Sequence, residues 1–296
     1  MSSPANALEI SAANALDLVA AGSIEMGAHR PQDARAIAAL LPAGTPVYVN
    51  HLPRHSLVDS LASLVAVRAA GLEPVPHIAA RRIASRAELQ SFLERAVQEA
   101  GVHKALILGG DEPAALGPYT DGADLIRTGL LKECGLREIG LPGYPEGHPR
   151  IPQMALEQAF AEKLALAGGH GLGAYVLTQF CFAPARILEY CSALSRSAPG
   201  VPVYVGLAGP TSPIALLRFA QRCGVSASLR ALQAQGLNAV RLVTRTDPGD
   251  QLAPLARYCG SRIADCNVVG VHLFSFGGVT ASAAWMNRII ATRGSG

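Results

Sequence analysis

The chain has 296 residues, of which half are hydrophobic and 16% are charged, and its formal net charge is +3. This composition supports a large core and excludes a disordered chain. The basic residues are scattered, which argues against nucleic acid as the main partner. No apolar run is long enough for a membrane span.

The N-terminus and the cysteines indicate the cellular compartment. The N-terminus lacks the basic segment and apolar core of a signal peptide. We expect residues 1–20 to form a short extension and residues 21–296 to form one domain. The six cysteines show no Cys-x-x-Cys spacing. Buried free thiols in a cytoplasmic protein are therefore expected, rather than disulfides. The sequence does not decide the oligomeric state, and a homo-oligomer is one of the alternatives.

Short apolar and β-branched runs recur along the chain and predict buried parallel strands. The most distinctive run is 176–182, which follows a glycine-rich stretch and contains one amide, Gln179. A buried amide must find hydrogen-bond partners in the fold or in a ligand. The predicted strands are 23–27, 46–50, 73–78, 104–108, 137–141, 176–182, 201–206 and 268–274.

Helical patterns separate these strands. Pro31, Ser56, Ser85 and Pro184 stand where a helix is expected to begin, and Gly71 stands where one is expected to end. The predicted helices are 31–41, 56–70, 86–100, 123–133, 153–167, a helix from Pro184 onward, 213–223, 226–235 and 280–290.

Eight alternations of strand and helix without a linker predict a single-domain (β/α)8 TIM barrel. The carboxyl ends of barrel strands meet at one rim, so polar residues there are candidates for a site. The residues at the expected strand ends are Glu25, Asn50, His51, His77, Asp111, Tyr144, Glu146, His148, Gln179 and Ser275.

Glu25 is the most informative of these residues because Ile24 and Met26 flank it. Burial among apolar neighbours should raise its pKa, as a general acid requires, although a structural pair with an arginine is the alternative. Asp111 follows two glycines and fits either a turn or a close approach to a planar ligand. His77 taken alone fits a satisfied core histidine more readily than a ligand-binding one.

Other motifs are excluded by their context. The glycine-rich stretch 168–173 follows a helix and precedes a strand, which is the reverse of a phosphate-binding loop. No cluster has metal-ligand spacing, so no metal is expected. No Gly-x-Ser-x-Gly elbow and no recognisable cysteine nucleophile are present.

Five short motifs together resemble the methylenetetrahydrofolate reductase family of flavoprotein (β/α)8 barrels. They cover roughly residues 20–290, and the last two are the most specific. The motifs are Ser-Ile-Glu at the first strand, Pro-His at the third, Gly-Asp at the fourth, Tyr-Pro-Glu-x-His-Pro after the fifth and Thr-Gln-Phe-x-Phe at the sixth.

The resemblance implies a role for each matching residue. Glu25 corresponds to the acid that opens the methylene bridge of the folate. Asp111 corresponds to a carboxylate near both pterin and flavin, and Gln179 to the amide that hydrogen-bonds the pterin. We expect these three side chains to face one cavity. The positions expected to contact FAD are Asn50, His51, His77, Gly110, Asp111, Tyr144, His148 and Lys163.

The chain also departs from the family pattern. It has Asn50-His51 where Thr-Tyr is usual, Gly109 in place of an arginine, and Phe276-Gly277-Gly278 where Asn-Arg is frequent. Without the arginine, phosphate contacts would rest on other basic groups. The candidates are Arg54, Arg81 and Arg82, and the Arg81-Arg82 pair otherwise reads as a solvated loop.

The hypothesis that follows is reduction of 5,10-methylenetetrahydrofolate through FAD, with NADH or NADPH as electron donor. A second hypothesis is a flavin-independent reductase that passes hydride directly from the nicotinamide to the folate. A third is a non-catalytic folate- or flavin-binding protein of one-carbon metabolism.

Overall fold

The computed structural model describes residues 14–51, 56–211, 247–261 and 266–292. Within these residues eight parallel strands follow one another in a closed barrel, and helices lie between them. The predicted (β/α)8 fold is therefore confirmed. The strands are β1 (Ser23–Met26), β2 (Pro46–Val49), β3 (Glu73–Ala79), β4 (Lys104–Leu108), β5 (Glu138–Gly143), β6 (Gly173–Thr178), β7 (Val203–Ala208) and β8 (Val268–Phe274).

The helices begin and end where local chemistry favours it. The Ser85 hydroxyl accepts the amide of Glu88 at 3.1 Å and caps one helix, which ends at Gly101 with a left-handed φ of 62°. The described helices are α2 (Asp33–Ala38), α3 (Leu57–Ala69), η1 (Ala80–Arg82), α4 (Arg86–Ala100), α5 (Gly122–Arg127), α6 (Leu130–Glu133), α7 (Gln153–Gly169), α8 (Pro184–Ser197), α12 (Gly249–Ser261) and α13 (Val279–Ala291).

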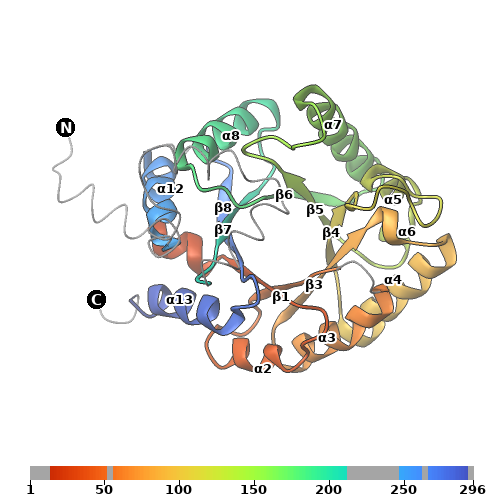
Figure 1. The fold of residues 1–296 in the computed structure, drawn as a ribbon, viewed down its shortest axis with the longest axis horizontal. Coiled ribbons are helices and arrows are strands. Elements are labelled where there is room, and N and C mark those ends of the chain that lie inside the picture. Colours follow the sequence, from red (N-terminus) through yellow and green to blue (C-terminus); the bar gives the residue numbers. More distant parts are fainter. Residues whose placement is uncertain (1–13, 52–55, 212–246, 262–265, 293–296) are drawn as a thin grey trace. The chain divides into compact units, whose positions relative to one another are not determined.

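The chain divides into two compact units. Unit 1 contains Met1–Ile24, Gly143–Arg150 and Leu177–Gly296, and unit 2 contains Glu25–Pro142 and Ile151–Val176. In unit 2, α3 and α4 pack side by side, with α3 along β3 (Figure 1). In unit 1, β8 pairs with both β7 and the start of β1.

A tightly packed centre holds unit 2 together. The Tyr48 hydroxyl donates to the Tyr175 hydroxyl at 2.8 Å, and both rings are buried. Gly140 makes room for this pair, because a Cβ there would lie 2.8 Å from the Tyr175 ring and 2.9 Å from Leu106. The strand β5 thus needs a glycine at this position for the two phenols to meet.

The structure corrects several predicted boundaries. The predicted helix 123–133 is broken into α5 and α6, because Gly129 adopts a φ of 76° between them. The predicted bounds of strand 176–182 are wrong, because β6 starts at Gly173 and ends at Thr178. Helix α12 was not predicted. The predicted helices 213–223 and 226–235 lie outside the described residues.

Candidate active site

Glu25 lies in β1 and keeps part of its surface open to solvent. Burial raises the pKa of this carboxyl to about 7, against the opposing effect of a hydrogen bond from Asn50. Asn50 Nδ2 donates to Glu25 Oε1 at 3.3 Å, and Asn50 Oδ1 accepts the amide of Ala28 at 3.2 Å. The second bond fixes the amide so that its NH₂ group faces the carboxyl. Glu25 is therefore balanced between acid and carboxylate near neutral pH.

His51 follows β2 and His77 lies inside β3 near its end, and both are buried, at 6% and 7% exposure. The pKa of His77 is lowered to about 3 by burial and by the charge of His51. Its ring stands edge-on to Tyr48 at a centroid distance of 5.9 Å. Nε2 of His77 has no hydrogen-bond partner in the part of the chain that the structure describes. A neutral imidazole with a buried, unsatisfied nitrogen is suited to a ligand.

The Arg81-Arg82 pair is not a solvated loop, and that interpretation of the sequence is wrong. Arg82 is 10% exposed, forms an ion pair with Glu112 and donates to the carbonyl of His51. Burial alone would raise the pKa of Glu112, but the Arg82 hydrogen bond and charge outweigh it and lower that pKa. Arg81 donates to the carbonyls of Thr120 and Glu112 at 2.8 and 2.9 Å. Both guanidinium groups are thus bound to the chain itself.

Gly110 and Asp111 follow β4. Gly110 has a φ of 98°, and a Cβ there would lie 3.0 Å from Glu112 Oε2 and 3.4 Å from Arg81 Cβ. Only glycine adopts this backbone without strain. The turn leaves Asp111 exposed, so its carboxylate can reach a charged group on a ligand. The proposed phosphate contact of Arg54 lies outside the described residues.

Lys163 projects from α7 and is partly buried. Burial lowers its pKa, while the charges of Asp121 and Glu162 raise it. Lys163 Cδ lies 3.6 Å from the position of a Cβ on Gly122, the first residue of α5. The side chain therefore runs along the start of α5. Its ammonium is a candidate contact for an anionic ligand.

In unit 1, Tyr144 and His148 lie in the segment after β5. Their rings meet edge-on at a centroid distance of 5.3 Å, and His148 Nδ1 accepts the amide of Arg150 at 3.2 Å. Burial and Glu146 both raise the pKa of the nearby Cys181 thiol. Cys181 is therefore protonated at neutral pH and is no nucleophile.

Gln179 follows β6 rather than lying inside it. Its amide N–H donates to the carbonyl of Gly143 at 2.8 Å, and the residue is partly buried. Thr178 ends the strand, and its hydroxyl accepts the amide of Gly206 at 2.9 Å. This arrangement holds the backbone of Gln179 firmly. The cavity that Glu25, Asp111 and Gln179 are expected to share stays a prediction.

An aromatic cluster in unit 1 was missed by the sequence analysis. It is formed by Phe180, Phe182, Phe274 and Phe276, with ring centroids of contacting pairs 5.0–6.2 Å apart. The signal was two Phe-x-Phe pairs, one after β6 and one at the end of β8. Beneath it, the Ser23 hydroxyl and Nδ1 of the buried His272 are hydrogen-bonded at 2.8 Å.

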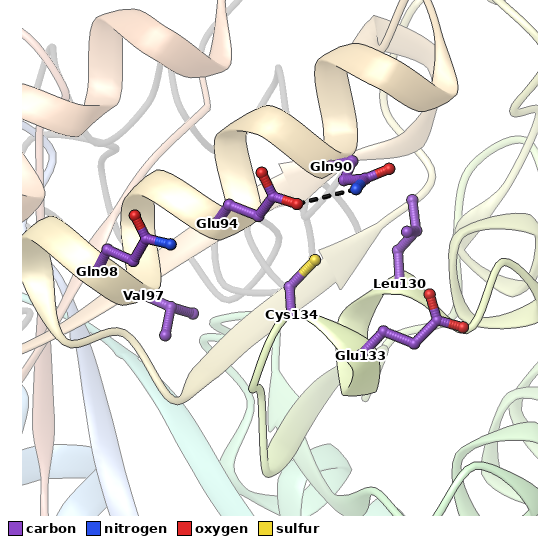
Figure 2. A pocket seen from close by; sticks show the side chains of 7 residues that line it. All are labelled: Gln90, Glu94, Val97, Gln98, Leu130, Glu133 and Cys134. Atoms are coloured by element: carbon purple, nitrogen blue, oxygen red, sulfur yellow. Dashed lines mark hydrogen bonds between the residues drawn. The ribbon is translucent and has the colours of Figure 1, made fainter.

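A pocket of about 320 Å³ lies between α4 and α6, and none of the residues predicted for the site lines it (Figure 2). On the α4 side of the pocket, Gln90 Nε2 donates to Glu94 Oε1 at 2.8 Å. Burial and two glutamates raise the pKa of Cys134, so its thiol is unreactive at neutral pH. The pocket residues are Gln90, Glu94, Val97, Gln98, Leu130, Glu133 and Cys134.

Within the ranges given above, no group of three or more His, Cys, Asp or Glu side chains is arranged to hold a metal ion. No helix in that part of the chain is both long and apolar enough to cross a membrane.

Solved structures share the fold at low sequence identity. An uncharacterized protein from Clostridium thermocellum, described as binding two copies of 5-methyl-5,6,7,8-tetrahydrofolic acid, matches with a TM-score of 0.60 and 13% identity. The match covers 92% of this chain and 96% of that one. A putative phosphonomutase from Burkholderia cenocepacia matches with a TM-score of 0.52 and 13% identity, over 98% of this chain and 100% of that one.

Sequence comparison is more specific. Methylenetetrahydrofolate reductase 2 of Saccharomyces cerevisiae is 27% identical over 176 residues, which cover 56% of this chain and 28% of the yeast protein. The match thus spans less than a third of that relative. The family model for methylenetetrahydrofolate reductase matches residues 54–235, which is more than half of the chain. The chain belongs to the methylenetetrahydrofolate reductase family.

Proposed function

We propose that this protein reduces 5,10-methylenetetrahydrofolate to 5-methyltetrahydrofolate, with FAD as bound cofactor and NADH or NADPH as electron donor. Family membership supports the reaction class. The observation that carries the proposal is the pKa of Glu25, raised to about 7 by burial. A carboxyl that is half protonated at neutral pH is suited to donate a proton and be recharged in each turnover.

Glu25 acts on the five-membered ring of the folate. Its proton goes to the ring nitrogen whose bond to the methylene carbon breaks, and the ring opens to a 5-iminium cation. The Asn50 amide donates to Glu25 Oε1 and orients the carboxyl. The hydride is then accepted at the methylene carbon, so the cation is reduced to the 5-methyl group.

Asp111 and Gln179 have supporting roles in this proposal. The exposed Asp111 carboxylate stabilises the iminium cation through its negative charge, which is most effective when the ligand excludes water. Gln179 hydrogen-bonds the pterin with its side-chain amide. The bond from its own N–H to Gly143 keeps this residue in place at 2.8 Å.

The residues of unit 2 fit a bound FAD in part. His77 offers a buried nitrogen without a partner in the described chain, and the turn at Gly110 is followed by the exposed Asp111. Lys163 would face the anionic part of the cofactor, and Asn50 and His51 are proposed as further contacts in this unit. Tyr144 and His148, which belong to unit 1, stay proposed FAD contacts from the family resemblance. A bound FAD would supply the hydride after reduction by the nicotinamide.

One observation favours the flavin-independent alternative. Arg81 and Arg82 are the basic residues nearest in sequence to the end of β3, and the chain itself uses both of them. The pyrophosphate of a resident FAD would then have to rely on Lys163 or displace the Arg82–Glu112 pair. A reductase without flavin has to accommodate only the pyrophosphate of NADH, which it holds for a single hydride transfer and then releases. The visible absorption of the purified protein separates the two, because a bound flavin is coloured and the nicotinamide is not.

The compartment belongs to the same proposal. The five cysteines of the described residues, Cys134, Cys181, Cys191, Cys259 and Cys266, are free thiols. Free thiols are typical of a reducing environment, so we place the reaction in the cytoplasm.

The deciding experiment incubates purified protein with 5,10-methylenetetrahydrofolate and NADH or NADPH, and measures 5-methyltetrahydrofolate by chromatography. We expect product to form in step with nicotinamide oxidation. Folate binding without oxidation of either nicotinamide would instead support a non-catalytic folate-binding protein.

A further inference from the structure

Phe276 has an unusual backbone conformation. Its φ is 48°, the one left-handed value among non-glycine residues in the described ranges, and Gly277 follows with a φ of 86°. Glycine would adopt this conformation without a steric penalty, whereas a bulky side chain is strained there. A strained residue at the carboxyl end of a barrel strand indicates that its side chain serves a purpose.

The ring of Phe276 is part of the aromatic cluster of unit 1. It lies nearly parallel to Phe274, at 18° and a centroid distance of 6.2 Å, and edge-on to Phe180 at 5.0 Å. Phe180 and Phe182 are 2% and 6% exposed, so they form the base of the cluster. Phe274 and Phe276 keep part of their surfaces exposed.

The aromatic cluster adjoins the backbone of Gln179. A Cβ on Gly206 would lie 2.6 Å from Phe274 Cε2 and 3.1 Å from the carbonyl carbon of Gln179. The Phe274 ring and the Gln179 backbone therefore both lie beside Gly206. Gln179 is also followed directly by Phe180, whose ring contacts Phe276. An amide and two partly exposed rings thus lie in one neighbourhood within unit 1.

We propose that Phe276 is a substrate-binding residue whose ring packs against the flat pterin held by Gln179. This inference rests on the proposed function and adds to it the residue that gives the site its aromatic face. Planar rings associate in offset-stacked or edge-on arrangements. The partly exposed rings of Phe274 and Phe276 are suited to either arrangement. Gly277 and Gly278 follow Phe276 and carry no side chain that would obstruct the approach.

Three substitutions at Phe276 distinguish the effect of the aromatic ring from the effect of the strained backbone. Phe276→Ala and Phe276→Gly both remove the ring, but only glycine relieves the strained φ. Phe276→Tyr keeps an aromatic ring. We expect the dissociation constant of 5-methyltetrahydrofolate, measured by titration calorimetry, to rise roughly tenfold in both the alanine and the glycine variants. The tyrosine variant should bind like the wild type.

Thermal unfolding provides the independent readout. The glycine variant should have a higher Tm than the alanine variant, although both bind folate equally weakly. The control Leu255→Ala removes a buried side chain of α12 in the same unit, and should lower Tm without changing the dissociation constant. Wild-type affinity in the alanine variant, or affinity that recovers with Tm in the glycine variant, overturns the inference. A wild-type protein that binds no 5-methyltetrahydrofolate overturns the proposed function first.

Discussion

Asn50 Nδ2 donates a hydrogen bond to Glu25 Oε1 at 3.3 Å, and the oxygen of the same amide accepts the Ala28 N–H. The carboxyl at the centre of the proposed mechanism thus accepts a hydrogen bond from an oriented amide. A cation would keep Glu25 ionised, whereas an amide leaves it free to carry a proton near neutral pH.

The pH dependence of turnover follows from the Glu25 pKa of about 7. The acid form is present below this pH and is lost above it. We expect the rate of 5-methyltetrahydrofolate formation at saturating substrate to fall roughly tenfold per pH unit on the alkaline side. A rate that stays constant between pH 7 and pH 9 would show that no group with this pKa donates the proton.

Replacing Asn50 tests the tuning of that pKa. Asn50→Ala removes the hydrogen bond that lowers the pKa of Glu25, so we expect the alkaline limb of the pH–rate profile to move to higher pH. Asn50→Asp places a second carboxyl beside Glu25 and should move it further in the same direction. A profile that stays in place, or moves to lower pH, would contradict the assigned contact.

Glu25 also links stability to pH. Because its folded pKa lies above its ordinary value, the folded state loses stability as pH rises from about 4.5 to about 7, and the loss persists above that range. Glu25→Gln removes the charge and should be more stable than the wild type by about 1–3 kcal/mol at pH 8. At pH 4.5 the two proteins should have similar unfolding free energies, as chemical denaturation can measure.

The Arg82–Glu112 pair should contribute to stability more than exposed pairs do. Arg82→Met leaves the partly buried Glu112 carboxylate without its cation, and we expect a loss of about 1–3 kcal/mol in unfolding free energy. The matched control is Arg95→Met in α4, whose Glu99 partner is exposed, and it should change stability little. Equal losses of unfolding free energy in the two variants would contradict the prediction that the Arg82–Glu112 pair stabilises the fold more than an exposed pair does.

Gly140 and Gly168 make a second matched pair within unit 2. Gly140→Ala would press a Cβ against Tyr175 and Leu106, and we expect a loss of about 1–3 kcal/mol. Gly168 lies in α7 with nothing within 4 Å of the added Cβ. Gly168→Ala should therefore stabilise the helix slightly. Denaturant titrations of both variants check the opposite signs.

The sequence predicted the barrel because its signals were local. The strand β4 and the helix α4 match their predicted residues, since an apolar run, the Ser85 cap and Gly101 mark them unambiguously. Flanking Ile24 and Met26 likewise predicted the raised pKa of Glu25, which the structure confirms. The roles of Glu25, Asp111 and Gln179 stay predictions.

The failures have physical reasons that a single sequence conceals. The apolar run continues through Phe180-Cys181-Phe182, but β6 ends at Thr178. The reason is that Phe180 and Phe182 pack in the aromatic cluster instead of pairing in the sheet. Helix α12 was hidden by Pro254 inside it. The engagement of Arg82 depends on Glu112, 30 positions away, and no local pattern shows such a contact.

The most direct test of the central claim is the turnover of the Glu25→Gln variant at pH 7, with 5-methyltetrahydrofolate formation and folate affinity measured on the same preparation. Loss of the proton donor should lower the rate by at least about a hundredfold while the affinity for 5-methyltetrahydrofolate stays close to that of the wild type. A variant that forms product at the wild-type rate would contradict the account.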